Sequence, residues 1–364
     1  MRRFLSIFIM LISIASNANS YDAIVSITPK MGEFETINQA ILSINKRLNS
    51  NEIFTIFVKN GHYNEKINLK DPNIMLIGED RDNTVIEYNL AAGMLDEQGN
   101  KIGTSGSAIF IVNASGIIIR NLTIRNSFDY RANQSLPKTN PARLTDPQAV
   151  AVLINNNSDR IRFDNVNLEG FQDTLYLKDN SRSYFTRVII SGHVDFIFGG
   201  GTAVIDDSEL IARSRYVTDG AYGYLTAPST NLNQSFGLVI INSRLTKEKH
   251  VPANTFALGR PWHPTTTFTD GRYADPNAVG FAVFINNEID DHIYGWDKMS
   301  GKDINGQKKW FYPEDSRFYE FNNQGVGAKR ADNKFLITQE QARKYRIESI
   351  FNDWPSKFLI KEIN

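Results

Sequence analysis

Two aspartates set in apolar, strand-like sequence are the residues of this chain best suited to chemistry. Asp173 is followed by Thr-Leu-Tyr-Leu, and Asp195 stands between Val194 and the run Phe-Ile-Phe. A lone aspartate in such sequence is commonly a turn or capping residue, but here the surroundings occur twice and Gln172 adjoins the first aspartate. Two neighbouring buried carboxylates do not easily both ionise. One would keep a proton as an acid, while the other stays charged as a nucleophile.

Three further polar residues could assist this pair. Arg260, in the sequence Gly-Arg-Pro-Trp, could keep one aspartate ionised and oriented, because a guanidinium can bind a carboxylate through two hydrogen bonds. Gln148, which precedes the apolar run 149–153, and Gln172 could donate amide hydrogen bonds to a developing oxyanion. The chain therefore contains candidates for an acid, a nucleophile, an anchoring cation and an oxyanion site.

Four segments resemble the pectin methylesterases, or pectinesterases, particularly those of bacteria. They are GFQDTLY at 170–176, GHVDFIFG at 192–199, YLTAPST at 224–230 and LGRPW at 258–262. They occur in the family's order, and the resemblance covers nearly the whole chain after the first 20 residues. It implies a carboxylic ester hydrolase, an aspartyl esterase that removes C6 methyl esters from galacturonate in pectin and releases methanol.

The resemblance also implies a role for each candidate residue. Asp195 would be the nucleophile, Asp173 the general acid and base, and Arg260 the anchoring arginine. Gln148 and Gln172 would hold the oxyanion. The implied substrate surface, with aromatic rings to pack on sugars and an arginine for a free uronate, comprises Thr104, Tyr176, Phe198, Arg215, Ala227, Trp262, Thr265 and Met299.

Two features depart from the family pattern. The step from Asp173 to Asp195 is one residue longer than usual, and we expect the turn 178–182 to absorb the surplus, because a shift within a strand would turn Asp195 to the opposite face. His193 replaces a small or polar residue and is predicted to be a solvated turn histidine. On sequence alone, Tyr176 and Phe198 could equally be core residues, because alternate strand residues face opposite ways.

Composition limits the partners that we expect. Lysine plus arginine equals aspartate plus glutamate, 40 each, which gives no support for binding to nucleic acid. The five histidines show no pair at metal-ligand spacing, so neither a metal nor a cofactor is expected. The expected partner is a polysaccharide, methylated homogalacturonan. We expect a monomer that does not bind a membrane.

The first 20 residues read as a secretory signal. Two arginines are followed by an apolar run at 4–14 and by Ala-Asn-Ser, a small-residue cleavage site. The apolar run is too short to span a bilayer. We expect export, to the outside of the cell or to the periplasm of a Gram-negative bacterium. Residues 21–364 contain no low-complexity linker and are predicted to form one domain.

A repeated phrase predicts an all-β solenoid. An apolar strand follows a polar residue at 121–124, 165–168, 187–190, 207–210 and 242–245, and successive steps of 22 and 20 residues separate the middle three. Continuous apolar strands at 53–58, 74–77, 108–112, 116–124, 150–154 and 160–168 are typical of parallel strands covered on both sides. A β-sandwich is the competing all-β fold. The resemblance implies a right-handed parallel β-helix, in which residues one coil apart lie on adjacent strands.

Helices and long insertions complete the predicted architecture. Amphipathic helices at 34–44 and 338–351, each with a capping box, are expected to cap the ends of the solenoid. Long loops are expected to form the walls of a cleft: 87–107, 126–147, 247–254, 264–278 and 290–333.

Two other functions remain open at this point. A pectate lyase or polygalacturonase would share the solenoid, but the former needs an acidic calcium cluster and the latter a different set of aspartates. A β-helical carbohydrate-binding protein with an inactive site belongs to another class of function. The joint presence of the two aspartates, the two glutamines and Arg260 argues against loss of the site.

Overall fold

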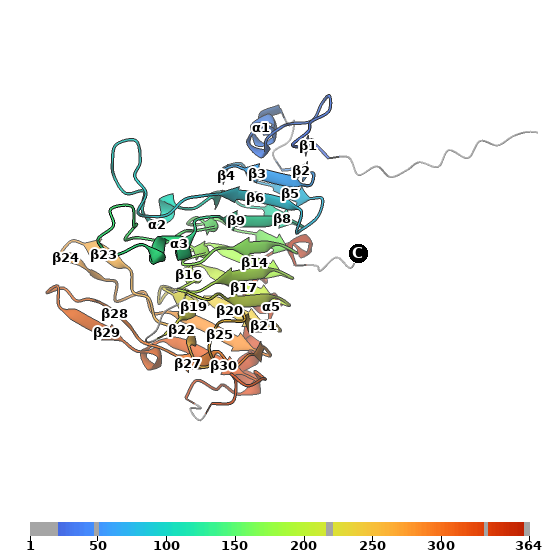
Figure 1. The fold of residues 1–364 in the computed structure, drawn as a ribbon. Helices are drawn as coiled ribbons and strands as arrows, with labels where there is room; N and C mark the ends of the chain where they lie inside the picture. Colours follow the sequence, from blue (N-terminus) through green and yellow to red (C-terminus); the bar gives the residue numbers. More distant parts are fainter. Residues whose placement is uncertain (1–20, 47–50, 216–220, 331–333, 360–364) are drawn as a thin grey trace, which may run out of the picture.

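The chain winds into a parallel β-helix whose coils stack along one axis (Figure 1). The computed structural model describes residues 21–46, 51–215, 221–330 and 334–359. The predicted secretory signal, residues 1–20, lies outside the described residues. The predicted fold class is confirmed, since every neighbouring pair of strands in the three large sheets is parallel.

Each complete coil contributes one strand to each of three sheets, and the first sheet has one additional strand at each end. The ten-stranded first sheet contains, in spatial order, β1 (Ala23–Val25), β2 (Phe54–Val58), β5 (Ile74–Gly78), β8 (Ile117–Arg120), β11 (Ile161–Asp164), β14 (Arg182–Thr186), β17 (Thr202–Asp206), β20 (Leu238–Ile241), β25 (Phe281–Ile285) and β30 (Arg317–Phe321). The eight-stranded second sheet contains β3 (Gly61–Asn64), β6 (Thr84–Tyr88), β9 (Thr123–Asn126), β12 (Asn167–Glu169), β15 (Ile189–Gly192), β18 (Glu209–Ala212), β21 (Arg244–Lys247) and β26 (Glu288–Ile289).

The third sheet, also of eight strands, carries the candidate site. It contains β4 (Ile67–Leu69), β7 (Phe110–Val112), β10 (Val152–Ile154), β13 (Leu175–Leu177), β16 (Ile197–Gly199), β19 (Gly223–Pro228), β22 (Phe256–Gly259) and β27 (Ile293–Trp296). Apolar side chains such as Leu175 and Ile197 point into the coil and belong to one continuous core.

The repeated phrase marks the corner between the first and second sheets. Its first residue has a left-handed backbone, with φ between 51° and 58°, at Asn121, Asn165, Arg187, Asp207 and Asn242. Asparagine and aspartate tolerate this conformation better than other side-chain-bearing residues, which accounts for their recurrence. The corner also splits the predicted strands 116–124 and 160–168 into two strands each.

The two terminal helical segments cover different parts of the solenoid. Helix α1 (Ile37–Leu42) lies at the N-terminal end (Figure 1) and begins with the predicted capping box of Thr36 and Gln39. At the C-terminus, the expected single helix is broken into α4 (Gln339–Ala342) and α5 (Ile347–Ile350) with a 3-10 turn between them. The chain there packs along the outer face of the first sheet, against residues such as Tyr184, rather than over an end.

The insertions form short helices and two antiparallel hairpins beside the third sheet. They carry α2 (Gly103–Gly106), α3 (Tyr130–Ser135), the hairpin of β23 (Thr265–Phe268) with β24 (Gly271–Ala274), and that of β28 (Met299–Lys302) with β29 (Lys308–Phe311). The prediction that 290–333 is one loop was wrong, because this segment also supplies β27 and β30 of the solenoid. No helix among the described residues is long and apolar enough to cross a membrane.

Candidate active site

Asp173 and Asp195 occupy equivalent positions on adjacent coils. The strands that follow them, β13 and β16, pair with Leu175 opposite Ile197. Asp173 lies two residues before Leu175, and Asp195 lies two residues before Ile197, so the two aspartates are in register. The Asp173 amide donates to the carbonyl of Val194 at 3.1 Å, which ties the two coils together at this point. Both carboxylate-bearing residues are buried, and both have a left-handed backbone, with φ of 65° and 50°.

The turn after the third sheet absorbs differences in coil length. Ile154, Leu177 and Gly199 lie opposite one another in the third sheet, and Ile161, Ser183 and Ala203 lie opposite one another in the first. The chain takes seven residues from Ile154 to Ile161, six from Leu177 to Ser183, and four from Gly199 to Ala203. The steps from the first to the second sheet stay constant across these coils. A turn of variable length at 178–182 therefore leaves the two aspartates in register despite their 22-residue separation.

Arg260 follows β22 and binds Asp195 through two hydrogen bonds. Its Nε donates to Oδ1 at 2.8 Å and its Nη2 donates to Oδ2 at 2.6 Å. On its other side, the guanidinium carbon lies 3.8 Å from the centre of the Tyr224 ring. The tyrosine on β19 and the aspartate before β16 thus hold the guanidinium between them, which fixes the direction of the Asp195 carboxylate.

The two aspartates differ in their electrostatic surroundings. Burial raises the pKa of Asp173 well above its ordinary value, and the charge of Asp195 raises it further. Arg260 and a hydrogen bond with Gln172 act in the opposite direction but do not cancel this rise. Burial beside Asp195 therefore favours the protonated form of Asp173, whereas Asp195 is paired with a guanidinium. The arrangement provides an acid beside an oriented carboxylate.

The two predicted oxyanion residues lie on neighbouring coils. The amide of Ala149, which follows Gln148, donates to the carbonyl of Gln172 at 3.1 Å. Both glutamine side chains are half-buried, and the buried Oε1 of Gln148 has no hydrogen-bond partner in the described part of the chain. The direction of their amide groups toward one common point stays a prediction.

Four of the predicted substrate residues form one cluster on the outside of the third sheet. Tyr176, Phe198 and Ala227 lie opposite one another on β13, β16 and β19. The rings of Tyr176 and Phe198 stack with their centres 4.2 Å apart, and Trp262 meets both edge-on at 6.3 and 5.6 Å. Their neighbours Leu175 and Ile197 face the interior, so the core-packing alternative does not hold. Leu153, opposite Tyr176 on β10, extends the row and was not predicted.

The other four predicted substrate residues lie on the insertions around this cluster. Thr104 is in α2, Thr265 begins β23 and Met299 begins β28. Arg215, which follows β18, donates to the carbonyl of Tyr222 at 3.2 Å, while its buried Nε has no partner in the described structure. Their contact with a substrate stays a prediction.

The prediction that His193 is a solvated turn residue was wrong. Its side chain is fully buried, with its ring centre 4.2 Å from that of Tyr130 and 5.6 Å from that of Phe171. Nδ1 accepts a hydrogen bond from the amide of Val194 at 2.7 Å. Burial lowers the pKa of His193 well below its ordinary value, and the nearby arginines lower it further. The covering residues come from distant segments, so local sequence gave no sign of this burial.

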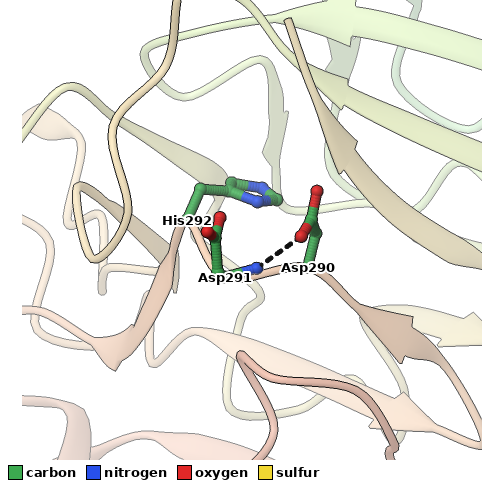
Figure 2. A group of neighbouring side chains, drawn as sticks. All are labelled: Asp290, Asp291 and His292. Atoms are coloured by element: carbon green, nitrogen blue, oxygen red, sulfur yellow. Dashed lines mark hydrogen bonds between the residues drawn. The ribbon is translucent and has the colours of Figure 1, made fainter. Parts of the chain in front are cut away.

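Within the part of the chain that the structure describes, one group of side chains has the composition of a metal site (Figure 2). The potential ligand atoms of Asp290, Asp291 and His292 lie within 4.8 Å of one another. His292 is fully buried, and burial lowers its pKa to about 4, so its ring is neutral at pH 7. Asp290 accepts from the Asp291 amide at 2.7 Å, and Lys247 forms an ion pair with Asp291. Because the lysine already places a positive charge on this group, we assign no metal to it.

Comparison with known proteins gives consistent matches over most of the chain. The family model described as Pectinesterase matches residues 22–352. Pectinesterase A of Dickeya chrysanthemi is 47% identical over 344 residues, which cover 93% of each chain. A solved pectin methylesterase from Yersinia enterocolitica is 55% identical, with a TM-score of 0.86, and the match covers 88% of this chain and 99% of that one. A crystal structure of a pectin methylesterase in complex with a hexasaccharide is 47% identical, with a TM-score of 0.89, and covers 93% of this chain and 99% of that one.

Proposed function

The chain belongs to the pectinesterase family and hydrolyses methyl esters of pectin, and we propose that Asp195 and Asp173 carry out this reaction as nucleophile and as general acid and base. In this assignment Arg260 orients the nucleophile, and Gln148 and Gln172 stabilise the oxyanion. The substrate is the C6 methyl ester of a galacturonate unit.

In the first half of the reaction, a carboxylate oxygen of Asp195 attacks the ester carbonyl carbon. The carbonyl oxygen gains negative charge, which the amides of Gln148 and Gln172 stabilise by hydrogen bonds. When the tetrahedral species collapses, the bond to the methoxy oxygen breaks and Asp173 gives its proton to that oxygen. Methanol leaves, and the galacturonyl group remains bound to Asp195 as an anhydride.

In the second half, Asp173 is a carboxylate and can act as a base. It takes a proton from a water molecule, whose oxygen attacks the galacturonyl carbon. The bond to Asp195 then breaks, which releases a galacturonate carboxyl group and restores the Asp195 carboxylate beside Arg260. Asp173 again carries a proton, so the cycle is closed without a metal or cofactor as reactant.

One observation carries this assignment: a buried aspartate with a raised pKa lies on the coil next to an aspartate that a guanidinium holds through two hydrogen bonds. The reaction needs one proton donor and one oriented carboxylate nucleophile, and these surroundings favour the protonated form of Asp173 and orient Asp195. The relative bound to a hexasaccharide supports a carbohydrate ligand for the aromatic cluster of Tyr176, Phe198 and Trp262.

The reaction class is tested by the products formed from highly methylated pectin. Residues 21–364 should release methanol without new reducing ends and without unsaturated sugar ends, which a polygalacturonase and a lyase would respectively produce. Release should be unchanged after dialysis against a chelator. Loss of activity on dialysis, with recovery on adding calcium, would contradict the metal-free mechanism. Failure to release methanol while binding pectin would favour a binding protein.

We further propose that residues 21–364 form one monomeric domain that acts outside the cytoplasm on methylated homogalacturonan. The basic start and apolar run of residues 1–20 support export. The N-terminal sequence of the protein recovered from the medium or periplasm, and its mass in solution, test these points. A mature protein that retains residues 1–20, or that elutes as a dimer, would contradict them.

A further inference from the structure

The hairpin of β28 and β29 has two faces of different character. Ser300 pairs with Trp310 and Lys302 with Lys308, while Met299 pairs with Phe311. Opposite residues of an antiparallel pair share a face, and successive residues alternate between faces. Ser300, Lys302, Lys308 and Trp310 therefore lie on one face, with Lys298 and Tyr312 continuing it beyond the last pair. We call these six residues the hairpin patch: Lys298, Ser300, Lys302, Lys308, Trp310 and Tyr312.

The two faces differ in what covers them. On the opposite face, the Phe311 ring stacks on His263 with centres 3.7 Å apart, and a Cβ atom placed on Gly301 would lie only 2.8 Å from that of Ala274. That face packs against the segment that follows Trp262. All six residues of the hairpin patch are exposed, including Trp310 at 40% and Tyr312 at 44% of their surface. Two large aromatic rings in water on one short hairpin suggest a binding function.

The hairpin patch carries positive charge that the protein does not neutralise. Residues 297–312 contain four lysines and two aspartates, in a chain whose formal net charge is zero. Elsewhere, lysines such as Lys59 and Lys101 form ion pairs with carboxylates. Within the described residues, no carboxylate forms an ion pair with Lys298, Lys302 or Lys308.

Aromatic contacts hold two of these lysines in place. The ammonium groups of Lys298 and Lys308 lie 4.8 and 4.1 Å from the centre of the Trp310 ring. Such contacts orient an ammonium group but leave its charge in place. The two nearby aspartates accept other hydrogen bonds: Asp303 from the amides of Asn305 and Gln307 at the hairpin tip, and Asp297 from the Tyr294 hydroxyl and the Lys298 amide. The result is a cationic surface whose lysines have no ion-pair partner among the described residues, beside exposed aromatic rings.

We propose that the hairpin patch binds a de-esterified stretch of galacturonan, apart from the active site. This proposal rests on the proposed function, because that reaction turns neutral methyl esters into carboxylates. Free uronate carboxylates complement the lysines, and the faces of sugar rings can pack on Trp310 and Tyr312. The patch lies on the opposite face of the hairpin from Met299, so a bound stretch does not occupy the predicted substrate surface. It would keep the protein on polymer that it has already processed.

The test compares binding of long, fully de-esterified polygalacturonate with hydrolysis of a short methylated oligomer. The patch variant replaces Lys298, Lys302 and Lys308 by glutamine, and a control variant makes the same change at three exposed lysines elsewhere: Lys70, Lys249 and Lys344. The patch variant should bind polygalacturonate about tenfold more weakly than the control variant at low salt, with no difference in oligomer hydrolysis. Trp310→Ala should weaken binding in the same assay.

Salt and a second polyanion complete the design. The difference between the two variants should disappear near 1 M salt, where charges are screened within about 3 Å. Equal polygalacturonate affinity of the two variants would overturn the proposal. The proposal would also be overturned if the patch variant bound anionic lipid vesicles more weakly than the control variant but bound polygalacturonate equally well, since the surface would then serve a membrane. Binding requires no turnover, so a failure of the wild-type protein to release methanol would count against the proposed reaction and not against this surface.

Discussion

Asp173 and Asp195 lie in register on adjacent coils, and both adopt a left-handed backbone, with φ of 65° and 50°. A non-glycine residue in this conformation costs about 1 kcal/mol or more unless it is asparagine or aspartate, whose short polar side chains tolerate it. Each aspartate therefore sits at a corner just before a strand of the third sheet. Asparagine is the substitution that removes the charge while keeping the backbone.

Asp195→Asn and Asp173→Asn should each remove nearly all methanol release while the protein remains folded. We expect kcat to fall by about 10²–10⁴ for the acid and by at least as much for the nucleophile, because one cycle needs both. Asp207→Asn is the matched control, since Asp207 also has a left-handed backbone, with φ of 51°, at a corner away from the third sheet. Retention of more than about a tenth of wild-type activity, a change of only about 1.4 kcal/mol, would show that the assigned role is wrong.

Local sequence predicted the solenoid because one conformational requirement repeats in successive coils from Asn121 to Asn242. Asn121, Asn165 and Asn242 each occupy the left-handed corner. Each is a polar residue directly before an apolar strand, so the pattern is recognisable in the sequence. The register of the two aspartates followed from the same periodicity. This register is kept despite the additional residue between the two aspartates, because differences in coil length are confined to the turn after the third sheet.

Features that depend on contacts between distant segments could not be predicted in this way. Phe351 and Trp354 cover the outer face of the first sheet. A capped amphipathic pattern predicts that one side of a helix is buried, but it does not identify the surface that this side packs against. His193 is buried by Tyr130, which arrives from an insertion. The position of the Arg260 guanidinium between Asp195 and Tyr224 likewise depends on three separate coils.

Arg260→Lys should lower kcat/KM by about a hundredfold, or about 2.7 kcal/mol, although the positive charge is retained. A lysine cannot donate the two parallel hydrogen bonds that orient Asp195, and it loses the flat contact with Tyr224. Arg182→Lys is the matched control, since Arg182 binds Asp353 through two hydrogen bonds of 2.7 Å near the C-terminal segment. A similar effect of both substitutions on kcat/KM would mean that Arg260 acts only through general stability.

The raised pKa of Asp173 should appear as a pH-dependent cost to folding. Unfolding returns this carboxyl to its ordinary pKa of about 3.9, so its contribution to stability is fully present below that pH and is lost as pH rises through the folded pKa. The free energy of unfolding of Asp173→Asn, minus that of the wild type, should therefore increase from pH 4 toward neutral pH. Urea denaturation at several pH values measures it, and a difference that stays flat would contradict the raised pKa. The kcat of the wild type should fall as pH rises through the folded pKa of Asp173, because the general acid is then deprotonated.

His193 is expected to position the peptide that joins the two catalytic coils. Its Nδ1 accepts from the amide of Val194 at 2.7 Å, and the carbonyl of Val194 accepts from the amide of Asp173 at 3.1 Å. His193→Ala removes the acceptor and leaves a buried cavity, so we expect a loss of about 2–4 kcal/mol of stability and about a tenfold lower kcat with KM unchanged. An asparagine side chain would keep an acceptor near the position of Nδ1, so His193→Asn should recover part of kcat.

The pH dependence of stability tests whether the His193 ring is neutral in the folded protein, as the hydrogen bond from Val194 requires. Nδ1 can accept a hydrogen bond only while the ring is neutral, and burial together with Arg215, Arg213 and Arg131 lowers the folded pKa well below the ordinary value of about 6.5. For a depressed pKa, the contribution to stability is fully present above the unfolded pKa and is lost as pH falls below it. Wild-type stability should therefore decline from about pH 6.5 downward more steeply than that of His193→Asn. Equal kcat values for the alanine and asparagine variants would rule out the hydrogen bond to Val194 as the source of the effect on kcat. Parallel stability curves for the asparagine variant and the wild type would contradict the depressed pKa of His193.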